Sequence, residues 1–217
     1  MMYFHPKTRP AWFLVFALIV LVLLASSCRR QPQGLPFDES IVVALVPFSQ
    51  AVTTADLMAG YISPGSQAVS EEALAGLDQS LEARITQPVM ASMEMAPCLE
   101  QAASALEDQA YSRLDYLVEA GKCAGADYVL SPQVLYWKER EGSAVGVTEP
   151  AGVAIDFHVV DVAEHSLDAR VHFEEDQVSL AENLLTIDKF VSRYGAWLTA
   201  RELAEEAIDK AVLELGL

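Results

Sequence analysis

The chain has 217 residues, with 31 acidic and 14 basic side chains and a formal net charge of −17. This length suits one domain of ordinary size. Such an acidic chain repels nucleic acid, and no dense run of Lys or Arg offsets the charge, so nucleic acid is excluded as a partner. The apolar fraction of 52% is high for a soluble protein, and one segment near the amino terminus contributes much of it.

The first 27 residues have the pattern of a signal peptide. A positive flank contains Lys7 and Arg9, and an unbroken apolar run follows from Ala11 to Leu24. As a helix this run would span about 21 Å, less than the roughly 30 Å of a bilayer core. The pattern therefore indicates a cleaved signal peptide rather than a permanent span.

The letters LLASSC at the end of this segment resemble the bacterial lipobox, whose cysteine receives a diacylglycerol before cleavage. We predict removal of residues 1–27 and lipidation of Cys28 with palmitate-type chains. Each buried CH₂ adds about 0.8 kcal/mol, so two or three chains would anchor the protein permanently. Ordinary cleavage near Ser27 and an uncleaved anchor are the alternatives.

Arg29 follows the predicted lipidated cysteine. In lipoprotein sorting an aspartate at this position usually means retention in the inner membrane. The resemblance to lipoproteins therefore implies the outer membrane, on its periplasmic side. Residues 28–40 form a polar tether with two prolines, and its twelve residues after the cysteine reach at most about 40 Å.

Loss of the signal peptide removes Lys7 and Arg9 and no acidic residue, leaving a net charge of −19. Solubility alone explains such a surface. A basic partner, or divalent cations at a membrane surface, are the other interpretations.

Two cysteines, Cys98 and Cys123, remain once Cys28 is assigned to lipid. An even number in an oxidising compartment allows a disulfide, which would stabilise the fold by about 3–4 kcal/mol on the chain-entropy model. Two buried thiols are the alternative. The sequence contains no CxxC pair and no zinc or haem spacing.

The domain begins with the run Ile41–Phe48, which predicts a strand buried on both faces and ended by Pro47. About twenty residues of loop follow, from Ser49 to Val69. Loops of this length are usually functional or disordered. Tyr61 and Ile62 at its centre are predicted partner contacts, with simple packing as the alternative.

Three helical segments come next. Ser70 caps the first, whose apolar face runs to the stop at Pro88. The methionine-rich stretch Val89–Pro97 is predicted to fill the core, with an adaptable partner surface as the alternative. Helical patterns resume over Leu99–Gln109 and Ser112–Gly121.

Tyr128–Trp137 is predicted to be a strand, and Glu139–Pro150 a loop. Gly142 and Gly146 in this loop are further predicted partner contacts. No phosphate-binding glycine motif lies here, so the position between strands explains the glycines.

The segments Val153–Val162 and Leu167–Phe173 alternate with period two, which predicts a β-hairpin with one buried face. The opposite face carries a polar cluster, namely Asp156, His158, Arg170, His172 and Glu174. In one register His158 and His172 would be cross-strand neighbours and could bind zinc. We favour a solvated face with cross-strand charge pairs, and predict no metal.

The carboxyl end is predicted to be helical. Leu180–Val191 gives a short segment, and a second helix begins at Thr199 with a capping box to Glu202. Its apolar stripe should pack on the sheet: Leu203, Ala207, Ile208, Ala211, Val212 and Leu215. There is no repeat, so residues 41–217 form a single domain.

No catalytic motif occurs: GxxxxGK[ST], GxSxG, SxxK and HExxH are all absent from the sequence. We therefore predict that the chain is not an enzyme and uses no cofactor.

Three phrases resemble one group of envelope lipoproteins, related to the TolB amino-terminal domain, CsgG and LpoB. They are IVVALVPF, AGKCAGADYVL and VVDVAEHS, the last with Glu164 and His165 in place of the usual Thr-Gly. The resemblance implies an α/β (α+β) fold: a single three-layer-type domain with a small mixed sheet, a C-terminal β-hairpin and packing helices. It also implies recognition of protein partners without catalytic residues.

The predicted function is thus a non-enzymatic, lipid-anchored assembly or accessory factor of the cell envelope. Its partners would be the membrane and envelope proteins, with self-association as a further prediction. The alternative is a periplasmic small-ligand or metal-binding lipoprotein that uses the His158/His172 face of the hairpin.

Overall fold

The computed structural model describes residues 40–107, 110–177, 193 and 195–217. Its centre is a mixed sheet in the order β1-β3-β6-β7, with β2 also paired to β3. β1 and β2 run parallel to β3, whereas β6 is antiparallel to both β3 and β7. The strands are β1 (Val43–Leu45), β2 (Ser49–Gln50), β3 (Tyr128–Lys138), β6 (Gly152–Asp161) and β7 (Ser166–Asp176). The small mixed sheet confirms the predicted fold class.

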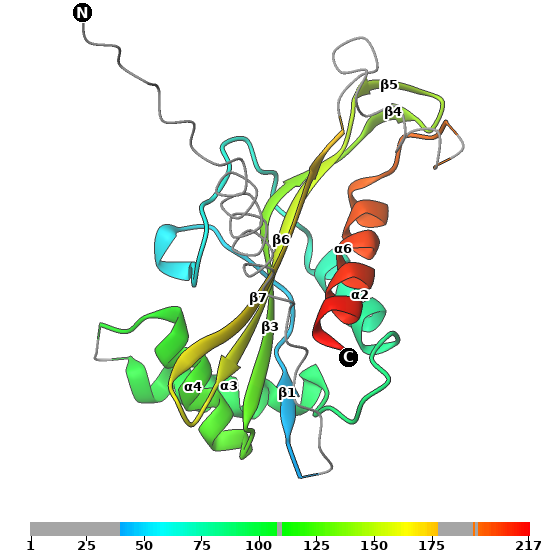
Figure 1. The fold of residues 1–217 in the computed structure, drawn as a ribbon. Coiled ribbons are helices and arrows are strands. Elements are labelled where there is room, and N and C mark those ends of the chain that lie inside the picture. Colours follow the sequence, from blue (N-terminus) through cyan, green and yellow to red (C-terminus); the bar gives the residue numbers. More distant parts are fainter. Residues whose placement is uncertain (1–39, 108–109, 178–192, 194) are drawn as a thin grey trace, which may run out of the picture. The chain divides into compact units, whose positions relative to one another are not determined.

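Helices cover both faces of this sheet (Figure 1). α2 (Glu71–Glu82) and α6 (Ala200–Leu215) pack on one face, and α3 (Ser92–Leu106) and α4 (Arg113–Ala124) on the other. A single turn of 3₁₀ helix, η2 (Thr54–Asp56), lies in the long loop after β2. The result is the three-layer α+β arrangement that the sequence predicts.

The main core lies between the sheet and the pair α2–α6. Val153, Ile155, Phe157 and Val159 of β6 alternate toward these helices and are fully buried. Phe48 meets the ring of Phe157 edge to face, with centroids 5.9 Å apart. The predicted period-two hairpin is thereby confirmed, and its buried face includes Ala169, Val171 and Phe173 of β7, whereas Leu167, which was expected on the same face, is exposed.

Two sets of residues pack on the opposite face of the sheet. α3 and α4 pack over Ala44, Val129 and Val160. Further along the strands, Leu57 and Ile62 of the long loop pack on a separate small cluster formed by Ala51, Leu135 and Ala154. The loop therefore completes a layer that helices only partly supply.

Local sequence signals fix the helix ends. Ser70, Ser112 and Thr199 each accept a hydrogen bond from the backbone N–H three residues on. Thr199 and Glu202 form the predicted capping box, with Glu202 Oε2 accepting from Thr199 N at 2.7 Å. The predicted stripe of α6 packs in the core.

The first strand is shorter than predicted. Pro47 ends it, and the chain rejoins the sheet as β2 two residues later. The open edge of β1 is covered by Met90, whose N–H donates to Val43 O at 2.8 Å and whose O accepts from Leu45 N at 3.0 Å.

The methionine-rich stretch is divided between the interior and the surface. Met95 is fully buried in the core, as predicted, and Met90 is partly buried there. Met93, in contrast, is exposed.

The segment predicted as a loop at Glu139–Pro150 is instead a small hairpin of β4 (Glu141–Ser143) and β5 (Gly146–Glu149). Gly142 has φ +108°, and a Cβ there would lie 2.5 Å from Gly146 O. Apolar and polar residues do not alternate in these short strands, so the sequence does not indicate that they pair with each other.

Some predictions lie outside the described residues. These are the signal segment, Cys28, the tether and the helix over Leu180–Val191. Within the described ranges, no helix is long and apolar enough to cross a bilayer.

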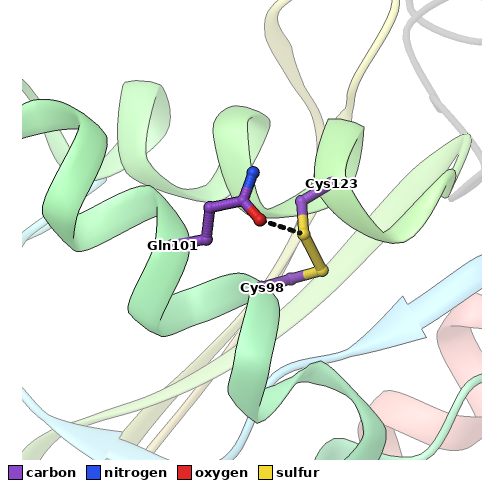
Figure 2. The surroundings of a disulfide bond; sticks show 3 residues. All are labelled: Cys98, Gln101 and Cys123. Carbon is purple, nitrogen blue, oxygen red and sulfur yellow. Dashed lines mark hydrogen bonds between the residues drawn. A yellow bond between two sulfur atoms is a disulfide. The ribbon is translucent and has the colours of Figure 1, made fainter.

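A disulfide joins Cys98 of α3 to Cys123 of α4, with Cα atoms 5.4 Å apart (Figure 2). Oε1 of Gln101 lies 3.5 Å from Sγ of Cys123. Cys123 is exposed and Cys98 is half-buried, so neither is the buried thiol that the alternative requires. The bond ties together the two helices of one layer.

We expect the variant with Cys98→Ser and Cys123→Ser to lose about 3–4 kcal/mol of unfolding free energy, since the bond closes a loop with a sequence separation of 25. Urea unfolding of the full chain in detergent measures this. Reductant should bring the wild type to the same midpoint and leave the variant unchanged. A wild type that is insensitive to reductant would contradict the prediction.

Candidate functional site

The Ser49–Val69 loop is fixed to the sheet at both ends. Nε2 of Gln50 donates to Gln67 O at 2.8 Å, and its Oε1 accepts from Val69 N at 2.9 Å. Gln67 N donates to Trp137 O at the end of β3, at 2.7 Å. The side chain of Gln50 and the backbone of Gln67 therefore hold the loop as a built part of the domain.

Asp56 closes the middle of this loop. Its Oδ2 accepts hydrogen bonds from Val52 N, Thr53 N and Thr53 Oγ1 at 2.7–3.0 Å. The hydrogen bond from the Thr53 backbone is the largest of the effects that lower the pKa of Asp56. Gln133 of β3 donates to Asp56 O at 2.8 Å, which joins this turn to the sheet.

The outer side of the loop presents apolar groups to solvent. Val52 is 76% exposed and Tyr61 is 62% exposed. Ile62 instead packs on the Leu135 cluster, as the packing alternative proposes. Contact with a partner stays a prediction for Tyr61 and Ile62. The sequence does not predict Val52 as a contact residue, because a single apolar residue in a loop does not by itself indicate a binding surface.

Beneath the loop lies Asp156, the most buried charged side chain of the predicted polar cluster. Its Oδ2 accepts from Nε of Arg170 at 2.9 Å and lies 2.8 Å from Nη2, and its Oδ1 contacts Nδ1 of His172 at 2.7 Å. Nε2 of His158 lies 3.5 Å from Oδ2. The buried carboxylate thus has a cationic partner on the neighbouring strand.

Two opposing effects set the pKa of Asp156. Burial raises it, and the contacts from His158, Arg170 and His172 together outweigh burial and lower it below 3.8. Because the folded-state pKa lies below the ordinary value of 3.8, the ionised carboxylate stabilises the fold at pH values above 3.8. This contribution is lost as the pH falls through the lowered pKa.

The interpretation of this hairpin face as solvated is wrong for its two innermost residues. Asp156 is 0% exposed and His158 is 1% exposed, and the long loop lies against Asp156, since a Cβ at Gly60 would lie 3.6 Å from Asp156 Oδ2. Gly60 in that loop has φ +81°, and a Cβ on it would lie 2.9 Å from Nη2 of Arg170. The predicted cross-strand charge pairing does occur.

The register places Asp156 opposite His172, and His158 opposite Arg170. The two histidines are therefore diagonal rather than direct neighbours. No group of three or more His, Cys, Asp or Glu in the described part of the chain could hold a metal ion. With both oxygens of Asp156 occupied, the geometry does not favour the metal-binding alternative.

A cavity of about 260 Å³ opens at this cluster. Its lining residues are Gly60, Tyr61, Ser63, Leu135, Ala154, Arg170, His172 and Glu174. Sites for drug-sized ligands usually measure about 300–1,000 Å³. The cavity is thus small, and it belongs to the junction between the loop and the sheet.

The other predicted contact residues, Gly142 and Gly146, both lie in the β4–β5 hairpin. Val145 at its tip is exposed. Trp197 N donates to Ala144 O at 2.8 Å, so the segment before α6 supports the turn. Gly142 has a conformational role, and contact with a partner stays a prediction.

No family model matches the chain, and no curated protein matches it. Among solved structures, the PelC dodecamer from Paraburkholderia phytofirmans is 15% identical. The alignment covers 84% of this chain and 94% of that one, with a TM-score of 0.42.

Two further structures are similar at the same level. The LpoB C-terminal domain from Salmonella enterica is 13% identical, with coverage of 67% and 89% and a TM-score of 0.38. Lipoprotein GNA1162 from Neisseria meningitidis is 13% identical, with coverage of 71% and 97% and a TM-score of 0.37. Similarities this low do not identify what the chain does, and the resemblance to TolB and CsgG stays a prediction.

Gly60→Ala and Gly65→Ala form a matched pair that tests the loop's contact with the Asp156 cluster. Both glycines have φ +81°, but nothing lies within 4 Å of a Cβ at Gly65. Gly65→Ala should therefore lose only the backbone cost, about 1–2 kcal/mol. Gly60→Ala should lose roughly 1–3 kcal/mol more, because the methyl group displaces Arg170 from Asp156.

Chemical unfolding of the two variants measures this difference. Equal losses in the two variants would show that the loop does not depend on the ion pair beneath it.

Proposed function

We propose that this chain is a lipid-anchored accessory factor of the bacterial cell envelope, held by Cys28 at the outer membrane and facing the periplasm. It acts through protein contacts and not through catalysis. The observation that carries the proposal is the lipobox-like LLASSC after a short apolar run with a positive flank. A permanent lipid anchor and a reach of at most about 40 Å keep the domain near its membrane.

The long loop supports the part of the proposal that concerns partners. It exposes Val52 and Tyr61 while its own backbone is hydrogen-bonded to β3 and to the side chain of Gln50. A surface already held in place loses less conformational entropy on binding than a free loop does. Tyrosine is also enriched among residues that dominate binding energy at interfaces. The β4–β5 tip, with Val145, is a second exposed surface.

Photo-crosslinking in whole cells tests the proposal directly. A photoreactive residue at Tyr61 should yield discrete crosslinked products with envelope proteins. Leu213 on α6 is 83% exposed and apolar, so the same residue placed there is a matched control that should give none.

The anchor provides the second arm of this experiment. Cys28→Ser should abolish incorporation of a clickable palmitate analogue and the Tyr61 products together. Products that are identical at Tyr61 and Leu213, or an absence of label on the wild type, would refute the proposal.

A further inference from the structure

A second cavity, of about 210 Å³, lies where the long loop meets the start of α4. Its lining residues are Ala55, Asp56, Tyr111, Arg113 and Tyr116. Tyr111 and Tyr116 are stacked, with centroids 6.4 Å apart and planes 29° apart. The cavity thus combines a flat aromatic wall with one cation and one carboxylate, and it adjoins the surface proposed to meet partners.

Arg113 has unmet hydrogen-bonding capacity. Its guanidinium lies over the ring of Tyr116, 5.2 Å from the centroid, and its only hydrogen bond among the described residues is a long one, 3.4 Å, from Nη2 to Ser49 Oγ. Nε is buried and has no partner within the described part of the chain. A buried N–H without an acceptor destabilises the folded state until an acceptor arrives.

Within the described ranges, the charge of Arg113 is also uncompensated at close range. No carboxylate of the described residues lies within ion-pair distance of it, although acids outnumber bases by 31 to 14. By contrast, Arg84, Arg170 and Arg193 contact carboxylates at 2.5–2.9 Å. As the first residue of α4, Arg113 also stands where the helix dipole disfavours a cation.

Asp56 does not supply the missing counterion. Its Oδ2 accepts from three donors of its own turn, which fixes that carboxylate in place. It reduces the cost of burying Arg113 only through space. Among the described residues, none supplies a close acceptor for the buried Nε of Arg113.

The geometry points to an Asp or Glu side chain of the protein partner as the group that enters this cavity and pairs with Arg113. This assignment rests on the proposed function, and it names the chemistry of the contact. Tyr111 and Tyr116 would flank the aliphatic part of that side chain, and the volume has room for little more. A carboxylate suits the guanidinium because it can accept two parallel N–H bonds.

The overall charge of −17 does not prevent this contact. At physiological ionic strength the Debye length is about 8 Å, so exposed acids farther away are largely screened. The nearby guanidinium then determines whether an anion binds. Binding should weaken at low salt, where the distant acids act on the incoming carboxylate as well.

The test uses the full chain in detergent and NMR titration with three probes: N-acetylglutamate α-amide, its neutral isostere N-acetylglutamine α-amide, and N-acetylglucosamine. The acid should give saturable shifts at the Arg113 Nε–H and the backbone amides of residues 112–116. The isostere should bind at least about 10-fold more weakly, since it lacks the charge. Arg113→Gln should abolish the response of the backbone amides, and Arg201→Gln on α6 should preserve it.

Equal responses to the acid and its isostere, or stronger binding of the sugar, would overturn the assignment. The comparison of probes on the wild type needs no variant, so it decides even if Arg113→Gln fails to fold. Failure of the proposed function looks different. If the wild type does not bind the acid, and the crosslinks at position 61 persist in Arg113→Gln, this inference alone fails. If the photoreactive residue at position 61 yields no crosslinked products in the otherwise wild-type chain, the proposed function is wrong.

Discussion

The buried carboxylate of Asp156 constrains the arrangement around it. An ionised group removed from water is tolerated only with partners in good geometry, and breaking such a pair costs about 3–5 kcal/mol when both groups are buried. Arg170 and His172 are partly exposed, so the cost here is smaller than that figure. The β6–β7 register puts both partners in reach, and the long loop lies beside them, so that a Cβ at Gly60 would come within 2.9 Å of Arg170 Nη2.

This constraint connects the fold to the proposed contact surface. α3 and α4 cover only part of their face of the sheet, and the loop covers the polar part with Leu57 and Ile62 as its apolar contacts. Because the loop is fixed from beneath, its outer side holds Val52 and Tyr61 in defined positions. The Arg113 cavity lies at the edge of the same loop. The domain thereby offers an ordered surface with both apolar and cationic features.

Elements with a strong local signal could be predicted from the sequence. The alternation in Val153–Val162 gave β6 and its buried face, and the Thr199–Glu202 capping box gave the start of α6. What covers each face could not be predicted in this way. The period-two pattern places Asp156 and His158 on the face opposite Phe157. It does not show that this polar face is buried too, because its burial depends on segments that are distant in the sequence. The Arg113 cavity was missed for the same reason, since it depends on segments that meet only in the fold. The β4–β5 hairpin is local, and it was missed because its short strands carry no apolar alternation.

Amide hydrogen exchange on the full chain tests most directly whether the Asp156 ion pair holds the loop in place. In Asp156→Asn, the N–H groups of the loop around residues 56–62 should exchange faster than in the wild type. The ladder between β3 and β6 should stay protected at a pH where both forms are folded. Unchanged exchange in the loop, with a normal Asp156→Asn fold, would contradict the account.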